Sequence, residues 1–246
     1  ASQLILAACK QQARIIFVGD YDVDGVSSTA MLKHSLDALG AKTRAILPHR
    51  IKDGYGLSQA IVNDILTSKP DLVITLDCGI SNVTEIAQLS TQSHTLIFDH
   101  HQLPDPLPQA TCILNPKFES PQHPYYDLCT AGLVYVFLSY LKQQHCPELQ
   151  LDFARHLACL GTVADVVPLH AENRRLVCQG LQDLHKSQHP GLQALLYVCN
   201  ISQTVDTQRI GFDLAPRLNA AGRLYEAKLA LDLLLDSDLS SAKQKA

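Results

Sequence analysis

Short apolar runs alternate with amphipathic stretches in the first half of the chain. Five runs rich in Val, Ile, Leu and Phe cover residues 15–19, 43–47, 71–76, 94–98 and 110–114. Each of the first three is followed by a loop and then by a stretch with helical spacing. Such alternation is typical of a parallel sheet covered by helices on both faces. We therefore predict a Rossmann-like α/β fold with five parallel strands and flanking helices, in which Ser58 and either Ser81 or Asn82 cap helices.

The second half of the chain carries only helical spacing. From about residue 129 the candidate helices cover residues 131–141, 151–162, 172–185, 190–199 and 227–235. The proline-rich stretch 103–127 is an irregular connection that contains the fifth strand. We predict an α/β part at 1–128 and a helical part at 129–246. The last residues, SSAKQKA, predict no closing element, and we expect the chain to be a fragment of a longer protein.

The composition fits a folded protein of the cytoplasm. Hydrophobic residues make up 46% and charged residues 18% of the chain, which excludes intrinsic disorder. The longest apolar run, at 131–141, is about half of the roughly 20 residues that a membrane-spanning helix needs, and no export signal opens the chain. The eight cysteines lie at least thirteen positions apart, which excludes CxxC motifs. We expect reduced thiols, mostly in the core, and no association with a membrane.

The formal net charge of −4 is unlike that of a simple nucleic-acid-binding module, which is usually basic. It does not exclude a nuclease, because two bound divalent cations would add a charge of about +4 and reverse the sign locally. The position of the acidic residues therefore matters more than their sum.

Three aspartates, Asp20, Asp22 and Asp24, alternate directly after the first apolar run. In an extended loop this spacing points the three carboxylates the same way, and they repel one another unless cations bind them. A solvated turn is the simpler interpretation of an Asp-rich loop. A calcium-binding EF-hand loop is disfavoured, because it needs a Glu where this chain has Met31 and a helix where it has an apolar run.

The helix predicted after Gly25 carries Ser27 in its first turn. Free N–H groups and hydroxyls there would suit a phosphate, although such hydroxyls also cap helices. The chain has no G-x-S-x-G, Walker A or G-x-G-x-x-G motif, so serine hydrolases, P-loop NTPases and dinucleotide-binding proteins are unsupported.

Further acids and two histidines follow other strands. Asp77 comes directly after the third apolar run, and Asp99, His100 and His101 come directly after the fourth. The carboxyl ends of parallel strands share one edge of a sheet, where ligand sites form in open α/β folds. Oxygen ligands with one or two imidazoles suit Mn²⁺ or Mg²⁺, and the number of acids favours two ions with a bridging carboxylate. Asp165, an isolated charge in an apolar segment, is either a helix-end residue or another ligand.

The segments GDYDVDG, LDCGIS, FDHH and GTVADVVPL stand in this order along the chain. Together they resemble the DHH phosphoesterase family, from about Arg14 to about Asp236. The segments PHRIKDGYGLS and PRLNAAGRL narrow the resemblance to the bacterial exonucleases of that family that are specific for single-stranded DNA.

The resemblance implies that the acids hold two divalent cations, Mn²⁺ or Mg²⁺. It assigns to the first ion Asp22 and Asp77. It assigns to the second ion Asp24, Asp77, His100 and Asp165. Asp77 would be the bridge between the two ions.

Two neighbours of these ligands also have roles in the family. By resemblance, His101 would contact the scissile phosphate, and Asp99 would support the histidines from behind. Many family members carry a histidine four positions before the residue that matches Asp22. Here that position is Val18, and we expect Asp20 to replace the histidine as a ligand.

The resemblance also implies contacts with the substrate. Arg50 would bind the 5′ phosphate of DNA through its guanidinium, unless it is only a surface arginine. The segment RLNAAGR would face the cleft from a helix that leads to a second domain, or it has a structural role only. Its polar residues are Arg217, Asn219 and Arg223.

The implied activity is 5′→3′ hydrolysis of single-stranded DNA in DNA repair and recombination, with a single-strand-binding protein and a helicase as partners. A DHH phosphodiesterase that acts on nanoRNA or cyclic dinucleotides is one alternative, and a non-catalytic DHH scaffold is another. The DHH-associated domain with its GGH-type motif, and the OB-fold domain, have no counterpart in this sequence.

Overall fold

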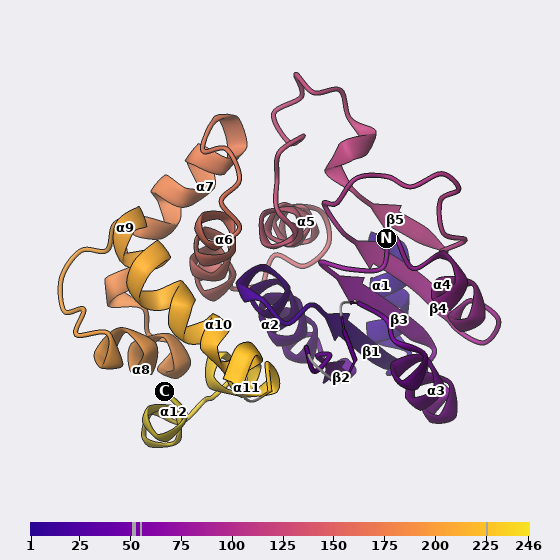
Figure 1. Cartoon of the computed structure of the whole chain (residues 1–246), viewed down its shortest axis with the longest axis horizontal. Helices are drawn as coiled ribbons and strands as arrows, with labels where there is room; N and C mark the ends of the chain where they lie inside the picture. Colours follow the sequence, from indigo (N-terminus) through magenta and orange to yellow (C-terminus); the bar gives the residue numbers. More distant parts are fainter. Residues whose placement is uncertain (51–52, 55, 225) are drawn as a thin grey trace.

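A five-stranded parallel sheet forms one side of the molecule in the computed structural model, which describes residues 1–246 except 51–52, 55 and 225. The strands stand in the order β2-β1-β3-β4-β5 (Figure 1). Their bounds are β1 (Arg14–Gly19), β2 (Lys42–Ile46), β3 (Leu72–Leu76), β4 (His94–Phe98) and β5 (Cys112–Leu114). All four pairings are parallel, so the predicted sheet is confirmed.

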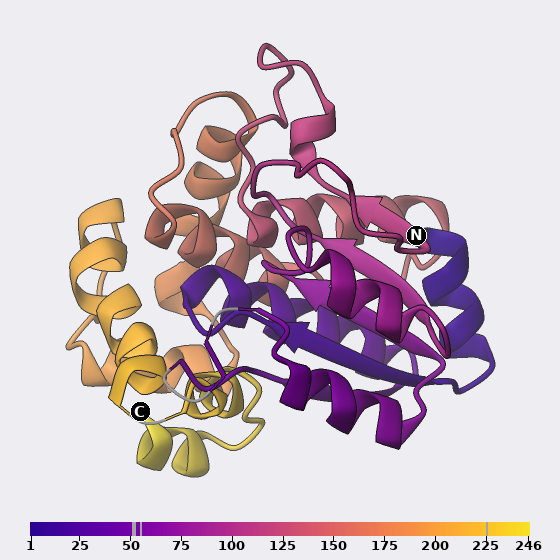
Figure 2. The same cartoon turned by 45° about the vertical axis from the view of Figure 1, so that its right-hand side comes forward.

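Alternate residues of the strands pack on opposite faces of the sheet. In β1, Ile15 and Phe17 join a core formed with α1 (Ser2–Lys10), α2 (Val23–Ala38) and α5 (Thr130–Gln144). Ile16 and Val18 join a smaller core formed with α3 (Gln59–Ser68) and α4 (Val83–Leu89), as Figure 2 shows from the side of these two helices. Since each buried Ile, Val or Phe contributes about 1.5–3 kcal/mol, both layers are strongly held.

The remaining helices form a second layer against α2 and α5 (Figure 1). They are α6 (Asp152–Ala164), α7 (Ala171–Leu181), α8 (Pro190–Val198), α9 (Thr207–Arg209), α10 (Ala215–Leu224), α11 (Lys228–Leu234) and α12 (Leu239–Lys245). Shorter turns are η1 (Pro116–Phe118), η2 (Leu184–Lys186) and the π-helical η3 (Ile210–Leu214). Helix α2 lies between the sheet and this layer, and it is buried on all sides from Val23 to Leu32.

The structure differs from the sequence analysis in three places. Helix α1 was not predicted, because one short helix before the first strand gives too little periodicity. The chain end forms α12, whose first turn is capped by Asp238 accepting from the N–H of Ser241 at 2.7 Å. Asp22 and Asp24 do not lie in an extended loop: Asp22 is the N-cap of α2, and Asp24 lies in its first turn.

The predicted cap of α3 is confirmed. Ser58 caps α3, because its hydroxyl accepts from the N–H of Ile61. All eight cysteines are free thiols, and six of them are buried. Within the part of the chain that the structure describes, every helix is too short or too polar to cross a bilayer.

The register of the three central strands brings their carboxyl ends to one level. Gly19 pairs with Leu76, and Leu76 pairs with Phe98. The next residue of each strand continues the ladder: the N–H of Asp20 donates to Leu76 at 3.1 Å, and the N–H of Asp77 donates to Phe98 at 2.9 Å. The acids therefore emerge side by side from one edge of the sheet.

Candidate metal centre

The predicted ligands gather at this edge. Within the described residues, three groups of side chains have ligand atoms within 4.8 Å of one another. One contains Asp20, Asp22 and Asp77. Another contains Asp24, His100 and Asp165, and the third contains Asp77, His100 and His101. Because Asp77 and His100 each belong to two groups, the groups form one continuous cluster, called here the acid cluster.

Asp77 stands in a strained backbone conformation at the centre of the acid cluster. Its φ is +63°, in the left-handed region that Asp tolerates better than most residues. Gly79 follows with φ +102°, and a Cβ there would collide with the hydroxyl of Thr75. This turn directs the Asp77 carboxylate inward, where only 2% of the residue is exposed and the hydroxyl of Thr130 donates to it at 3.0 Å.

The start of α2 holds Asp22 and Asp24. Asp22 accepts from the N–H of Gly25 at 3.0 Å, and a Cβ at Gly25 would lie 2.5 Å from the backbone of Asp20. Glycine at this position therefore lets the helix begin directly against the strand end. Asp24 accepts from two backbone N–H groups at the start of α5, and the positive end of that helix dipole favours its negative charge.

His100 lies between two carboxylates. Its Nε2 is 3.4 Å from Oδ1 of Asp77 and 3.6 Å from Oδ2 of Asp165. Adjacent ligands of an octahedral ion with bonds of 2.0–2.1 Å lie about 3 Å apart, so these separations suit ligands of a shared ion. Burial lowers the pKa of His100, which favours the neutral ring that a metal needs. Asp165 is the C-cap of α6, so both of its predicted roles are compatible with its position.

His101 is oriented by Asp99. Oδ1 of Asp99 accepts from the N–H of His101 at 3.0 Å and lies 2.7 Å from its Nδ1, while Oδ2 accepts from the N–H of Ile80 at 3.0 Å. The hydrogen bond to Asp99 raises the pKa of His101. Burial alone would raise the pKa of Asp99, but the hydrogen bonds with His101 lower it. The His101 side chain is 44% exposed, so its ring can reach a bound molecule.

The acid cluster carries more negative charge than a protein interior tolerates. Burial, followed by the charge of Asp22, raises the pKa of Asp20 to about 7. Burial and the charges of Asp24 and Asp22 raise the pKa of Asp165 to about 7. Burial and the same neighbours raise the pKa of Asp77 well above its usual range. Divalent cations would relieve this repulsion, so the donor set fits hard cations such as Mn²⁺ or Mg²⁺.

The position where family members carry a histidine is part of the core. Val18 is fully buried against the α3 and α4 side of the sheet. Asp20 lies with Asp22 and Asp77 instead, and its replacement of the histidine as a ligand stays a prediction.

The predicted substrate contacts lie in different places. The guanidinium of Arg50 is 5.5 Å from the ring centroid of Tyr21, which stands between Asp20 and Asp22. Arg50 is therefore beside the acid cluster. Ser27 is fully buried, so it is not exposed for contact with a phosphate.

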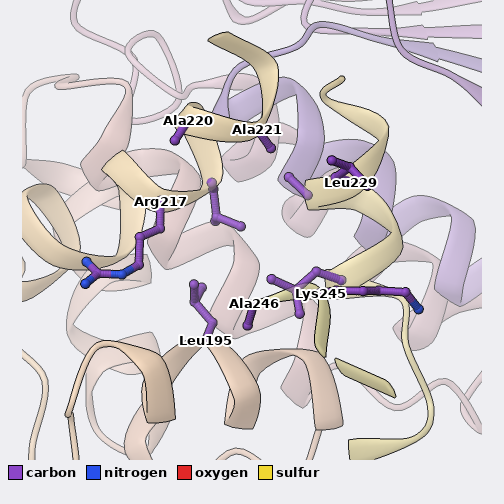
Figure 3. Close-up of a pocket in the computed structure, with 10 residues that line it drawn as sticks. Leu195, Arg217, Ala220, Ala221, Leu229, Lys245 and Ala246 are labelled. Carbon is purple, nitrogen blue, oxygen red and sulfur yellow. The ribbon is translucent and has the colours of Figure 1, made fainter. Parts of the chain in front are cut away.

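Arg217 lies away from the acid cluster, and its predicted contact with the substrate stays a prediction. It lines a separate pocket of about 210 Å³ between α8, α10, α11 and α12 (Figure 3), and its Nη1 donates to the carbonyl of Asp213. Asn219 is half-buried on the same helix. Residues two apart on a helix point about 200° apart, so Arg217 and Asn219 cannot share one face. The side chain of Arg223 lies outside the described residues.

Two residues that contact the site, Asn115 and Thr130, were not predicted. Asn115 donates from Nδ2 to the carbonyl of His101 at 2.9 Å, and its place after the fifth strand was the only sequence signal. Thr130 contacts two acids, and nothing in the local sequence distinguishes it from an ordinary residue at a helix start.

Comparisons with known proteins agree with this geometry. The model of the DHH family, N-terminal domain, matches residues 14–162. The single-stranded-DNA-specific exonuclease RecJ of Bacillus subtilis is 36% identical over the whole chain, which spans 31% of that protein. Among solved structures, exonuclease RecJ bound to manganese is 34% identical with a TM-score of 0.90, covering 99% of this chain and 62% of that one. RecJ of Thermus thermophilus in complex with Mn²⁺ is 32% identical with a TM-score of 0.86, covering 99% of this chain and 35% of that one. The chain thus spans less than half the length of the curated relatives it matches.

Proposed function

The chain belongs to the DHH family, and from this membership and the acid cluster we propose that it is a metal-dependent phosphodiesterase that degrades single-stranded DNA in the 5′→3′ direction. One observation carries the proposal. Asp77 shares one ligand group with Asp20 and Asp22, and its Oδ1 also lies 3.4 Å from Nε2 of His100. A carboxylate in this position suits a bridge between two ions.

The proposal divides the acid cluster into two metal sites. Asp20, Asp22 and Asp77 would hold one Mn²⁺ or Mg²⁺ ion. The second ion would be held by Asp24, Asp77, His100 and Asp165. When bound, the two ions would lower the pKa of a water molecule and stabilise the charge that develops on the phosphoryl oxygens.

The side chains around the ions would bind and orient the DNA. His101, with its raised pKa and exposed ring, would donate a hydrogen bond to a non-bridging oxygen of the scissile phosphate. Asp99 would hold the ring of His101 in the required tautomer, with Nδ1 protonated. Arg50, beside Tyr21, would bind the terminal 5′ phosphate.

The substrate class is supported by the relatives, which are named as exonucleases specific for single-stranded DNA. The net charge of −4 implies modest affinity that depends on contacts with phosphates and falls with salt. A nuclease restricted to single strands needs its substrate to be opened and kept open, so we include a helicase and a single-strand-binding protein as partners. The cytoplasm, where eight free thiols stay reduced, is the proposed location.

Digestion of one oligonucleotide labelled at either end tests this function. With Mn²⁺, a 5′-labelled single strand should release labelled mononucleotide at once, whereas a 3′-labelled strand should shorten progressively. The reverse pattern, or attack on a duplex at the same rate, would contradict the proposal. Faster hydrolysis of dinucleotides than of the long strand would favour the nanoRNA or cyclic-dinucleotide alternative. Absence of any Mn²⁺ effect on thermal stability would favour the scaffold.

A further inference from the structure

Thr130 is not a member of the acid cluster but donates hydrogen bonds to two of its acids. The residue is the first of α5, and none of it is exposed to solvent. Its hydroxyl donates to Oδ1 of Asp77 at 3.0 Å, and its backbone N–H donates to Oδ2 of Asp24 at 2.8 Å. Thr130 therefore contacts the proposed bridging acid, Asp77, and one acid of the second proposed metal site, Asp24.

The hydrogen bond to Asp77 restricts how that carboxylate can turn. Oδ1 of Asp77 accepts from Thr130 and also lies 3.4 Å from Nε2 of His100. A carboxylate oxygen has two lone pairs, so a hydroxyl on one side leaves the other side for a cation. The Thr130 hydroxyl therefore favours the rotation of the Asp77 carboxylate in which Oδ1 faces His100.

The start of α5 holds the other acid in the same way. The N–H of Ala131 donates to Oδ1 of Asp24 at 2.8 Å, alongside the N–H of Thr130 on Oδ2. Both oxygens of Asp24 are thus fixed by consecutive N–H groups at the positive end of a 15-residue helix. The distance between Asp24 and Asp77 is consequently set by one rigid element.

We propose that Thr130 is a positioning residue of the metal centre: its hydroxyl holds Asp77 in the orientation that two cations share. The inference rests on the proposed function, because it assigns Thr130 a task only if metal ions bind. If the hydroxyl only needed a hydrogen-bond partner because it is buried, its loss would lower the stability of the fold and leave metal affinity unchanged. The two roles differ in what the loss of the hydroxyl does to metal affinity.

The test compares Mn²⁺ titrations of the full chain by calorimetry and by electron paramagnetic resonance. Thr130→Val removes the hydroxyl at nearly constant shape, and Thr130→Ser keeps it. Thr95→Val is the matched control, because Thr95 is 1% exposed and its hydroxyl is bonded to Ser90 and to the N–H of Thr111 at the opposite end of the sheet. Loss of a partner behind a metal ligand typically weakens metal binding about 10–100-fold, and we expect at least the lower figure for Thr130→Val.

The expected result is that Thr130→Val weakens Mn²⁺ binding and reduces the spin-coupled signal of an ion pair, while Thr130→Ser and Thr95→Val bind as the parent chain does. Equal Mn²⁺ affinity in Thr130→Val and the parent would overturn the inference and leave the proposed function standing. Weakened binding in Thr130→Ser as well would also overturn it, since the hydroxyl would not be the cause. A parent chain that binds no Mn²⁺ would overturn the proposed function itself.

Discussion

Oδ1 of Asp77 and Nε2 of His100 lie 3.4 Å apart although the two residues follow different strands of the sheet. The parallel pairing of β3 with β4 creates this proximity, because it puts the residues after Leu76 and Phe98 at one level. The register of the strands therefore determines which side chains come together in the acid cluster. A change at Asp77 should affect both halves of the acid cluster at once.

Asp77→Asn should abolish Mn²⁺ binding and stabilise the metal-free protein. The pKa of Asp77 is raised in the fold, so its carboxyl destabilises the fold increasingly as pH rises through that pKa, and an amide removes this cost. At pH 8 we therefore expect a higher free energy of unfolding and a higher Tm for the metal-free variant than for the metal-free parent.

Thermal unfolding with and without Mn²⁺ measures both effects. Asp64→Asn, at an exposed aspartate that pairs with Arg44, is the control and should leave the Mn²⁺ response unchanged. A variant at Asp77 that still gains stability from Mn²⁺ as the parent does would refute the role of bridge.

Gly161→Ala should damage the site through packing. A Cβ at Gly161 would lie 2.5 Å from Cβ of Ala131 and 2.9 Å from Oδ1 of Asp24, so α6 would have to move away from α5. Overpacking of this kind costs about 1–3 kcal/mol, and the shift would carry Asp165 at the end of α6 away from His100. Urea unfolding should show a lower free energy of unfolding, and a Mn²⁺ titration should show a lower affinity for Mn²⁺.

The matched control is Gly211→Ala, because a Cβ at Gly211 meets nothing within 4 Å. If Gly161→Ala kept the parent's Mn²⁺ affinity, the close approach of α6 would be irrelevant to the metal centre.

Arg50→Ala should weaken the use of 5′-phosphorylated ends. A charged hydrogen bond contributes about 1.5–3 kcal/mol, so we expect KM for a 5′-phosphorylated strand to rise about tenfold or more with little change in kcat. On 5′-hydroxyl strands the variant should match the parent. Arg44→Ala, on the surface beside Asp64, is the control. Equal losses on the two kinds of end would show that Arg50 does not bind the terminal phosphate.

His189 should make the fold sensitive to acid. Its ring stacks on Phe153 at a centroid distance of 3.8 Å, and burial, followed by the charge of His34, lowers its pKa to about 4. The unfolded side chain has a pKa of about 6.5. As pH falls from that value toward 4, the unfolded state takes up a proton before the folded state does, so the free energy of unfolding decreases. Between pH 7 and pH 5 the free energy of unfolding should fall less in His189→Phe, which keeps the stack, than in the parent. We expect the difference to be on the order of 1 kcal/mol.

Urea unfolding at the two pH values measures this loss. His34 and His156 also have pKa values lowered by burial, so some acid sensitivity should remain in the variant. The exposed His145, replaced in the same way, serves as the control. An unchanged difference between pH 7 and pH 5 in His189→Phe would contradict the prediction.

The sequence predicted those parts of the site that depend on strand ends. Asp77, Asp99 and His100 follow apolar runs directly, so a parallel sheet was enough to bring them together. The start of α2 was misplaced, because Asp22 and Asp24 are compatible with a loop and with a helix N-terminus. Thr130 was missed because its partner Asp24 lies 106 positions away, and no local pattern reports such a contact.

In the helical half, too, contacts between distant segments could not be predicted from the sequence. The apolar spacing predicted most of its helices, but which face of α10 meets which neighbour depends on packing with η3, α11 and α2. For that reason the sequence did not predict that Arg217, expected on a helix facing the cleft, lines the pocket of Figure 3.

If Asp77 bridges two cations, anomalous diffraction from a crystal grown with Mn²⁺ should locate both ions beside its carboxylate. We expect two anomalous peaks about 3.5–4 Å apart, with Asp77 between them, one beside Asp20 and Asp22 and the other beside His100 and Asp165. A single peak, or peaks that avoid the Asp77 carboxylate, would contradict the bridging role.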